Sequence, residues 1–120
     1  YGHQVGDDIL KEMAIVIQRQ IRDIDILARY GGEEFAVLLP QTAVDQAEPV
    51  AERIRQSVES NEFVTPEGKI RMTVSLGIAA YPECDVDNQT ELVQMADAAM
   101  YEAKTAGKNR IVTSGANDAI

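Results

Sequence analysis

The segment Arg29–Phe35, with the sequence RYGGEEF, lies between two apolar runs and decides the fold more than any other part of the chain. These runs overlap the two ends of the segment and span Ile24–Tyr30 and Glu34–Leu39. Two such runs joined by Gly31 and Gly32 predict a β-hairpin, because glycine adopts the positive φ angles of a tight hairpin turn without steric cost. A turn of glycines also lets a ligand approach the backbone without meeting a Cβ atom.

Two adjacent carboxylates, Glu33 and Glu34, follow this turn directly. Neighbouring side chains of a strand point to opposite faces, but close to a turn this alternation relaxes, so both carboxylates can reach one site. Carboxylate oxygens suit Mg²⁺, and a metal ion beside a phosphate ester activates a hydroxyl nucleophile. The alternative is a plain hairpin whose glutamates face water, and spacing alone favours that interpretation.

Outward from the hairpin, apolar residues at helical spacing predict a helix on each side. The first spans Asp8–Arg22, with Asp7 in the N-cap position. The second follows an N-cap at Thr42 or Asp45 and runs through residue 58. Pro49 favours Asp45, because proline is tolerated in the first turn of a helix, where no amide donor is needed.

The C-terminal half predicts one more helix and two more strands. The helix spans Gln89–Ala106, with Asn88 as its N-cap and Gly107 just after its end. The strands span Arg71–Ala80 and Arg110–Thr113, and Val64–Ile70 is predicted as a turn. Alternate residues of the longer strand are small, so a helix can pack closely against that face.

The predicted order, α-β-β-α-β-α-β, favours an α+β fold, an α/β sandwich in which helices flank a largely antiparallel central sheet. The 120 residues suffice for one compact domain, and the small polar residues 114–120 are typical of a C-terminal tail.

Composition narrows the class of function. The net charge is −9, so the chain repels nucleic acid polymers and anionic membranes on average. A small anionic ligand that carries Mg²⁺ remains compatible with this charge. The single cysteine, Cys84, excludes an internal disulfide and suits a reducing cytoplasm. No apolar run reaches the length of a membrane-spanning helix.

Residues 31–35 (GGEEF) match the signature of the GGDEF family in its GGEEF form. Three further parts of the chain resemble the family in the right order: residues 1–8 (YGHQVGDD), 74–79 (VSLGIA), and 96–104 with 107–109 (ADAAMYEAK and GKN). The resemblance covers almost all of residues 1–113 and implies a GGDEF domain there, with a fold like that of nucleotide cyclases and polymerase palms. It implies a diguanylate cyclase, in which two domains meet face to face and condense two GTP into cyclic di-GMP and two pyrophosphates.

The resemblance also implies roles for the hairpin residues. Glu33 corresponds to a ligand of Mg²⁺ or Mn²⁺ that helps to deprotonate the attacking 3′-hydroxyl, and Glu34 to a second acidic position that assists the metals. Gly31 and Gly32 correspond to the turn that lets the nucleotide approach.

Three further positions correspond to substrate contacts. Asp7 matches a carboxylate that accepts hydrogen bonds from guanine, and its alternative role is the helix N-cap. Lys104 and Lys108 match basic residues that hold the terminal phosphates, and their alternative is favourable placement near a helix C-terminus.

Arg22 and Asp25 match the family's inhibitory site, where the product cyclic di-GMP binds, and Arg53 resembles its secondary arginine. An Arg fork grips a phosphate or a guanine edge at two points. The alternative is a surface salt bridge that contributes little to stability.

The family's domain begins earlier than Tyr1, with a helix and a first strand that carries an Asp metal ligand and sits centrally in the sheet. We therefore expect these 120 residues to hold part of the active site, with unpaired strand edges that invite another chain. The family also implies an upstream sensor domain and a cytoplasmic location, even where the parent is membrane-anchored.

Three functions remain open from the sequence. The first is a cyclase domain, which the intact Glu33 and Glu34 favour. The second is a catalytically silent module that binds cyclic di-GMP through Arg22 and Asp25. The third is a pure interaction domain whose hairpin matches the signature by chance.

Overall fold

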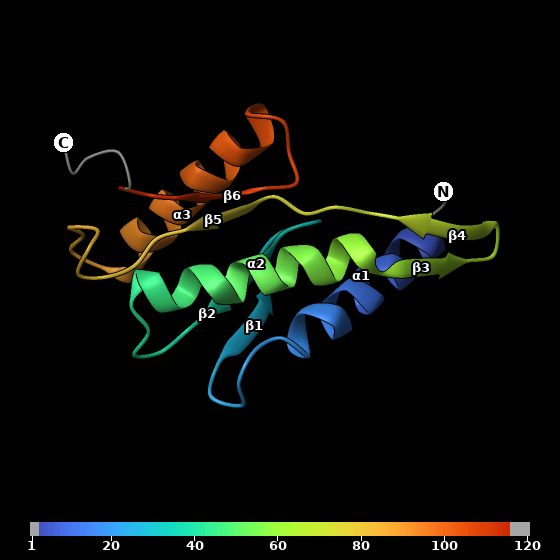
Figure 1. Cartoon of the computed structure of the whole chain (residues 1–120), viewed down its shortest axis with the longest axis horizontal. Helices are drawn as coiled ribbons and strands as arrows, with labels where there is room; N and C mark the ends of the chain where they lie inside the picture. The colour runs from blue at the N-terminus through green and yellow to red at the C-terminus, as the bar shows by residue number, and fades with distance from the viewer. Residues whose placement is uncertain (1–2, 116–120) are drawn as a thin grey trace.

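Within residues 3–115, which a computed structural model describes, helices and strands alternate in the order α-β-β-α-β-β-β-α-β (Figure 1). Residues 1–2 and the predicted tail from residue 116 onward lie outside the described residues. The elements are α1 (His3–Gln18), β1 (Ile26–Arg29), β2 (Phe35–Leu38), α2 (Val44–Ser60), β3 (Glu62–Thr65), β4 (Gly68–Arg71), β5 (Leu76–Ile78), α3 (Gln89–Thr105) and β6 (Ile111–Thr113).

The strands pair two by two. β1 and β2 form an antiparallel hairpin in which Arg29 lies opposite Phe35, and β3 and β4 form a second antiparallel hairpin. β5 and β6 are parallel, with Leu76 opposite Ile111. The α+β class is confirmed, and two of the three pairs are antiparallel as expected. Within the described residues, however, the strands form separate two-stranded sheets and not one continuous central sheet.

The core lies between α1, α2 and the β3–β4 hairpin. Phe63 and Val58 are completely buried at its centre. The other buried members come from the apolar stripes of the two helices: Ile9, Met13, Val16, Ile17 and Ile54. A smaller cluster of Ala47, Ala51 and Ile78 joins α2 to β5.

The first helix is shifted towards the N-terminus relative to the prediction. It begins at His3, so Asp7 lies inside α1 and the predicted N-cap is wrong. It ends at Gln18 instead of Arg22. The Asp25 carboxylate accepts a hydrogen bond from the Arg22 backbone amide (2.7 Å), and this side chain–backbone turn replaces the last helical turn.

The β1–β2 hairpin is present as predicted, but its loop is longer. Arg29 pairs with Phe35, so five residues connect the strands, and neither Gly31 nor Gly32 has a positive φ. The predicted tight turn with positive φ angles at the glycines is wrong, because a loop of this length turns the chain without left-handed residues.

Neither predicted N-cap begins the second helix. Its N-cap is Ala43, and Pro49 lies in the second turn instead of the first. One capping contact is local, because the Gln46 side chain accepts a hydrogen bond from the Ala43 amide (3.4 Å), and a second comes from elsewhere in the fold, because the Glu83 carboxylate accepts from the Val44 amide (3.1 Å). The residues around the start of the helix do not indicate a contact with Glu83, which is distant in the sequence.

The predicted turn at Val64–Ile70 contains the end of β3 and most of β4, with Pro66 and Glu67 at the tip between them. The predicted strand Arg71–Ala80 is divided, because β4 ends at Arg71 and β5 pairs with β6 over Leu76–Ile78 alone. The chain between them runs extended in Figure 1.

The third helix follows the prediction closely. The Asn88 side chain accepts a hydrogen bond from the Glu91 amide (3.0 Å), and Gly107 follows the helix with φ +130°. A Cβ atom at Gly77 would overlap the Ala96 carbonyl oxygen and the Met100 amide nitrogen. The close approach predicted for the small-residue face of the strand is thus confirmed at Gly77.

We expect Gly77→Ala to lower the free energy of unfolding by about 1–3 kcal/mol, because the added methyl forces backbone apart in a packed site. Gly6→Ala in α1 is the matched control. Nothing lies within 4 Å of its added Cβ, so the helix should gain up to about 1 kcal/mol. Urea unfolding of both variants checks the pair, and equal stabilities would contradict the packing at Gly77.

None of the helices in residues 3–115 combines the length and the apolar character that crossing a lipid bilayer requires.

Candidate functional site

The tip of the β1–β2 hairpin carries the glycines and carboxylates together. The Tyr30 amide donates to the Glu34 carbonyl (2.8 Å), which closes the loop around residues 31–33. A Cβ at Gly32 would meet no atom within 4 Å, so space for an approaching ligand is present there. Glu33 is exposed and Glu34 is half-buried.

Arg29 holds the loop in place. Its Nε and Nη2 atoms donate to the Gly32 carbonyl oxygen at 3.2 and 2.6 Å. This forked contact links the last residue of β1 to the middle of the loop, so Arg29 supports the backbone from which Glu33 projects. No role was predicted for Arg29 from the sequence, because its contact with a loop carbonyl depends on the folded backbone of the loop.

Glu33 and Glu34 have carboxylates available for a cation. Among the described residues, neither side chain has a hydrogen-bond or ion-pair partner. Across the same part of the chain, no group of three or more His, Cys, Asp or Glu lies close enough to hold a metal ion. The two glutamates alone therefore do not form a metal site, and a complete coordination shell needs oxygen atoms from elsewhere.

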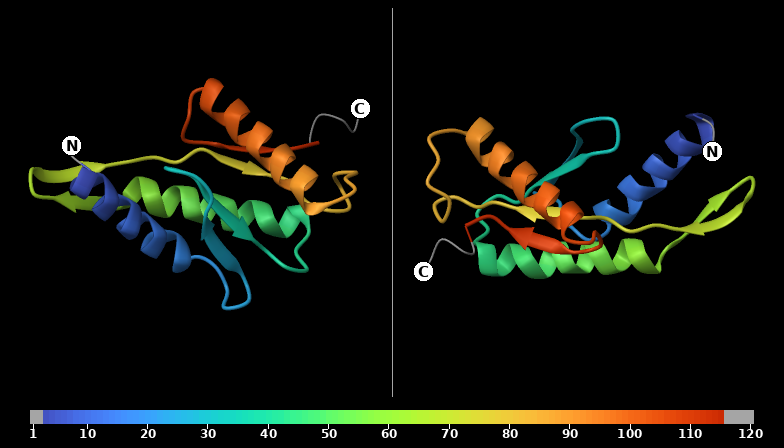
Figure 2. Two further views of the ribbon diagram at one scale, coloured as in Figure 1. Left: turned by 180° about the vertical axis from the view of Figure 1, so that it is seen from behind. Right: turned by 90° about the horizontal axis from the view of Figure 1, so that it is seen from above.

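The predicted substrate contacts lie on other elements. Asp7 is exposed on the N-terminal half of α1, and Figure 2 shows that this half projects from the same side of the molecule as the hairpin tip, opposite α2. Lys104 is exposed in the last turn of α3, and Lys108 is exposed in the turn that follows. No hydrogen bond or ion pair between described residues joins these three to the hairpin tip.

Arg22 and Asp25 form a tight pair at the entry to β1. The Arg22 Nη2 atom lies 2.8 Å from Asp25 Oδ1, and its Nε donates to both carboxylate oxygens at 3.1–3.2 Å. The Asp25 side chain is 1% exposed and that of Arg22 is 53% exposed. Hydrogen bonds from Arg22 hold the pKa of Asp25 below its usual value, so the carboxylate stays ionised.

Arg22 also reaches the segment after β2. Its Nη2 donates to the Pro40 carbonyl (3.2 Å) and to Thr42 Oγ1 (2.9 Å). Arg53 of α2 donates to the Gln20 carbonyl (2.7 Å), two residues before Arg22. Arg53 thus contacts the segment just before Arg22, and the Arg22–Asp25 pair also ties two loops together.

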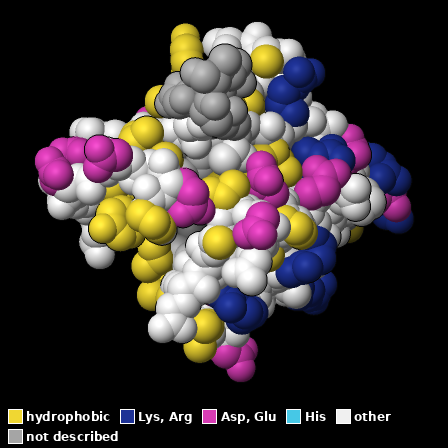
Figure 3. Space-filling view, turned by 60° about the vertical axis from the view of Figure 1, so that its left-hand side comes forward, with side chains coloured by type: hydrophobic (Ala, Val, Ile, Leu, Met, Phe, Trp, Pro, Cys, Tyr) yellow, Lys and Arg dark blue, Asp and Glu magenta, His cyan; other side chains and the backbone are white. Residues whose placement is uncertain are grey.

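The surface in Figure 3 carries charges of both signs. On the face in Figure 3, acidic and basic side chains lie interspersed with hydrophobic ones, and the described part of this face has no broad basic patch. Such a face does not favour a nucleic acid polymer.

Comparison with known proteins places this geometry in a family. A family model described as "Diguanylate cyclase, GGDEF domain" matches residues 1–110. Diguanylate cyclase A of Treponema denticola is 44% identical over 117 residues, which are 98% of this chain and 31% of that protein. The response regulator PleD of Caulobacter vibrioides is 38% identical over 118 residues, 97% of this chain and 26% of that protein. The chain therefore spans less than a third of these two relatives.

A solved structure supports the same assignment. The GGDEF domain of YfiN (TpbB) from Pseudomonas aeruginosa has a TM-score of 0.86 and 35% identity, and the match covers 97% of this chain and 72% of that one. By family model, by sequence and by fold, the chain belongs to the GGDEF domain family, whose named members include diguanylate cyclases.

Proposed function

We propose that this chain is the greater part of a catalytic GGDEF domain, which condenses two GTP into cyclic di-GMP within the protein that contains it. The observation that carries the proposal is the hairpin tip. Its loop is open at Gly32, is held by Arg29, and presents two carboxylates that have no hydrogen-bond or ion-pair partner within residues 3–115. Two adjacent carboxylates beside an open backbone are the groups that a metal-assisted reaction at a phosphate uses.

The proposed chemistry is a phosphoryl transfer between two GTP molecules. A carboxylate oxygen of Glu33 accepts the proton of one 3′-hydroxyl, and the 3′-oxygen then forms a bond to the α-phosphorus of the other GTP. The bond from this phosphorus to the bridging oxygen breaks, and pyrophosphate leaves with the electron pair. The same step at the second nucleotide closes the ring, so two pyrophosphates leave for each product.

Other residues bind and orient the nucleotide in this proposal. Asp7 accepts hydrogen bonds from the guanine edge. It is free to do so, because it lies within α1 and does not cap the helix. Lys104 and Lys108 hold the terminal phosphates. Because one domain binds one GTP, two copies must face each other for the reaction to occur.

Glu33 and Glu34 are the proposed ligands of Mg²⁺ or Mn²⁺. When bound, such an ion stabilises the negative charge that develops on the phosphate. The described residues supply two carboxylates, and we infer that further ligands come from a segment outside these 120 residues.

The separate sheets support the same inference. β1–β2 and β5–β6 have no hydrogen-bonded strand between them in the described residues, and YfiN's solved GGDEF domain extends beyond the part that this chain matches. We propose that a strand from the rest of the protein joins these sheets. The GGDEF domain then includes residues 1–113, and residues 114–120 are a tail.

The Arg22–Asp25 pair is the proposed inhibitory site for the product. A structure of the coiled coil and GGDEF domain of DgcB from Caulobacter crescentus contains c-di-GMP; it has a TM-score of 0.83 and 31% identity, over 95% of this chain and 60% of that one. Asp25 is fully engaged by Arg22 here, so a ligand that takes the guanidinium must compete with Asp25, Pro40 and Thr42.

We expect Arg22→Ala to weaken cyclic di-GMP binding about ten- to hundredfold, since one charge-assisted contact is lost, and to relieve product inhibition. Thr42→Ala is the control, because it removes a loop contact of Arg22 and leaves the guanidinium in place. Calorimetry on the full protein measures both. Equal affinity of Arg22→Ala and the wild type would remove this site from the account.

A silent module that binds cyclic di-GMP is the second candidate, because the half-exposed Arg22 serves it equally well. GTP turnover by the full protein separates the two functions, since only the cyclase forms cyclic di-GMP from GTP.

A further inference from the structure

The turn between α3 and β6 has an unusual backbone. Gly107, Lys108 and Asn109 have φ angles of +130°, +64° and +49°, so three successive residues lie in the left-handed region. Lysine has no preference for this region, unlike glycine and asparagine. Contacts elsewhere must therefore hold Lys108 in this conformation.

Asn109 anchors the turn to a different element, α2. Its Oδ1 accepts a hydrogen bond from Arg55 Nη1 (2.9 Å), and its amide nitrogen donates to Glu59. Arg55 is held in turn by a forked contact with Glu52, in which both hydrogen bonds are 2.8 Å long. The Arg55 side chain is only 16% exposed, so this network is partly shielded from water.

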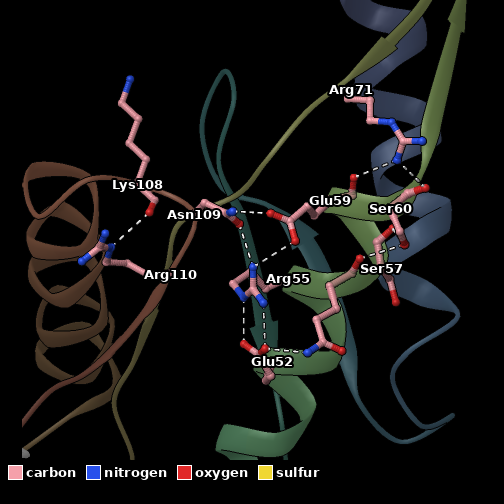
Figure 4. Close-up of polar contacts among 10 residues, drawn as sticks. Glu52, Arg55, Ser57, Glu59, Ser60, Arg71, Lys108, Asn109 and Arg110 are labelled. Carbon is pink, nitrogen blue, oxygen red and sulfur yellow. Dashed lines mark hydrogen bonds and ion pairs between the residues drawn. The ribbon is translucent and has the colours of Figure 1, made fainter.

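The two side chains of the turn diverge. Figure 4 shows Asn109 directed into the network on α2, whereas Lys108 extends away from it and its ammonium group contacts none of the residues drawn. The Lys108 carbonyl accepts a hydrogen bond from Arg110 Nε (3.1 Å), and its amide donates to the Ala103 carbonyl (3.0 Å). The backbone of Lys108 is thus fixed, so its side chain leaves from a defined point.

We propose that Asn109, held by Arg55 and Glu59, is a positioning residue that sets where Lys108 presents its ammonium group to the terminal phosphates of the nucleotide. This inference rests on the proposed role of Lys108 in GTP binding. A side chain that is merely structural would instead join α2 to the turn with no consequence for the ligand.

The test variant is Asn109→Gly in the full protein. Glycine keeps the left-handed backbone, and only the link to Arg55 and Glu59 is lost. We expect the KM for GTP to rise about tenfold, as for one misplaced charge-assisted contact, with kcat changed less than about twofold. Lys108→Ala should raise KM at least as much.

The double variant, Asn109→Gly with Lys108→Ala, shows whether Asn109 acts through Lys108. If Asn109 acts through Lys108, adding Asn109→Gly to Lys108→Ala raises KM no further. Thr113→Ala is the control: its Oγ1 donates to the Glu48 carboxylate (2.7 Å), so it tests loss of another side-chain link to α2, one that touches no residue of the network. We expect this control to leave KM unchanged.

Two outcomes overturn the inference: an unchanged KM in Asn109→Gly, or KM effects that multiply in the double variant. If Lys108→Ala alone leaves KM unchanged, the proposed role of Lys108 fails, and the inference fails with it. If Asn109→Gly does not fold, Arg55→Lys takes its place. A lysine cannot make the fork to Glu52 while reaching Asn109, so KM should again rise, and an unchanged KM would contradict the proposal.

Discussion

Replacing Glu33 by Gln is expected to reduce cyclic di-GMP formation by the full protein on the order of a thousandfold. A neutral amide cannot accept the hydroxyl proton or neutralise a divalent cation as the carboxylate does. Losing ~4 kcal/mol of transition-state stabilisation, a magnitude typical of metal-assisted sites, corresponds to that factor in rate. Product measured by chromatography over time, at saturating GTP, gives the loss directly.

The fold should survive this change. Glu33 is exposed and has no partner among the described residues, so the melting temperature should stay within about two degrees of the wild type. Glu67→Gln is the matched control, because Glu67 is also an exposed glutamate at a hairpin tip, between β3 and β4. Near-normal turnover in Glu33→Gln with unchanged stability would remove Glu33 from the site.

The second large effect concerns residues 1–120 expressed alone. We expect them to form no monomeric, active domain, because the sheet is divided and the β1–β2 hairpin exposes apolar side chains. Ile24, Ile26 and Leu38 are 58%, 54% and 54% exposed, and Ile26 lies opposite Leu38 in the hairpin register. Unpaired strand edges beside such a surface recruit other strands.

Light scattering, thermal unfolding and GTP turnover with Mg²⁺ test this expectation, with the full protein measured beside the 120 residues. The expected result is self-association, or a broad unfolding transition, with no cyclic di-GMP. A monodisperse monomer that unfolds cooperatively and makes cyclic di-GMP would show that no further strand or metal ligand is needed.

Local signals in the sequence predicted the parts of the fold that depend on neighbouring residues. Asn88 caps α3, Gly107 ends it, and Gly77 allows the helix to approach, all as the sequence indicated. Boundaries that depend on distant partners were wrong. The start of α2 is capped by Glu83 from another loop, and this contact has no local signature.

In the candidate site, too, features that depend on neighbouring residues were predicted and features that depend on distant contacts were not. The sequence predicted that the hairpin tip would carry Glu33 and Glu34, because the glycines and carboxylates are contiguous. It did not indicate Arg29 or Asn109, whose roles depend on a loop carbonyl and on a network from α2. Asp7 as a helix cap failed, because α1 continues past it towards the N-terminus. Its role with guanine stays a prediction.

The central claim is that this domain makes cyclic di-GMP, and one measurement tests it most directly. The purified full protein is incubated with GTP and Mg²⁺, and cyclic di-GMP and pyrophosphate are quantified together. The account predicts two pyrophosphates for each cyclic di-GMP, with both products lost in Glu33→Gln. A folded protein that binds GTP but forms no cyclic di-GMP would contradict it.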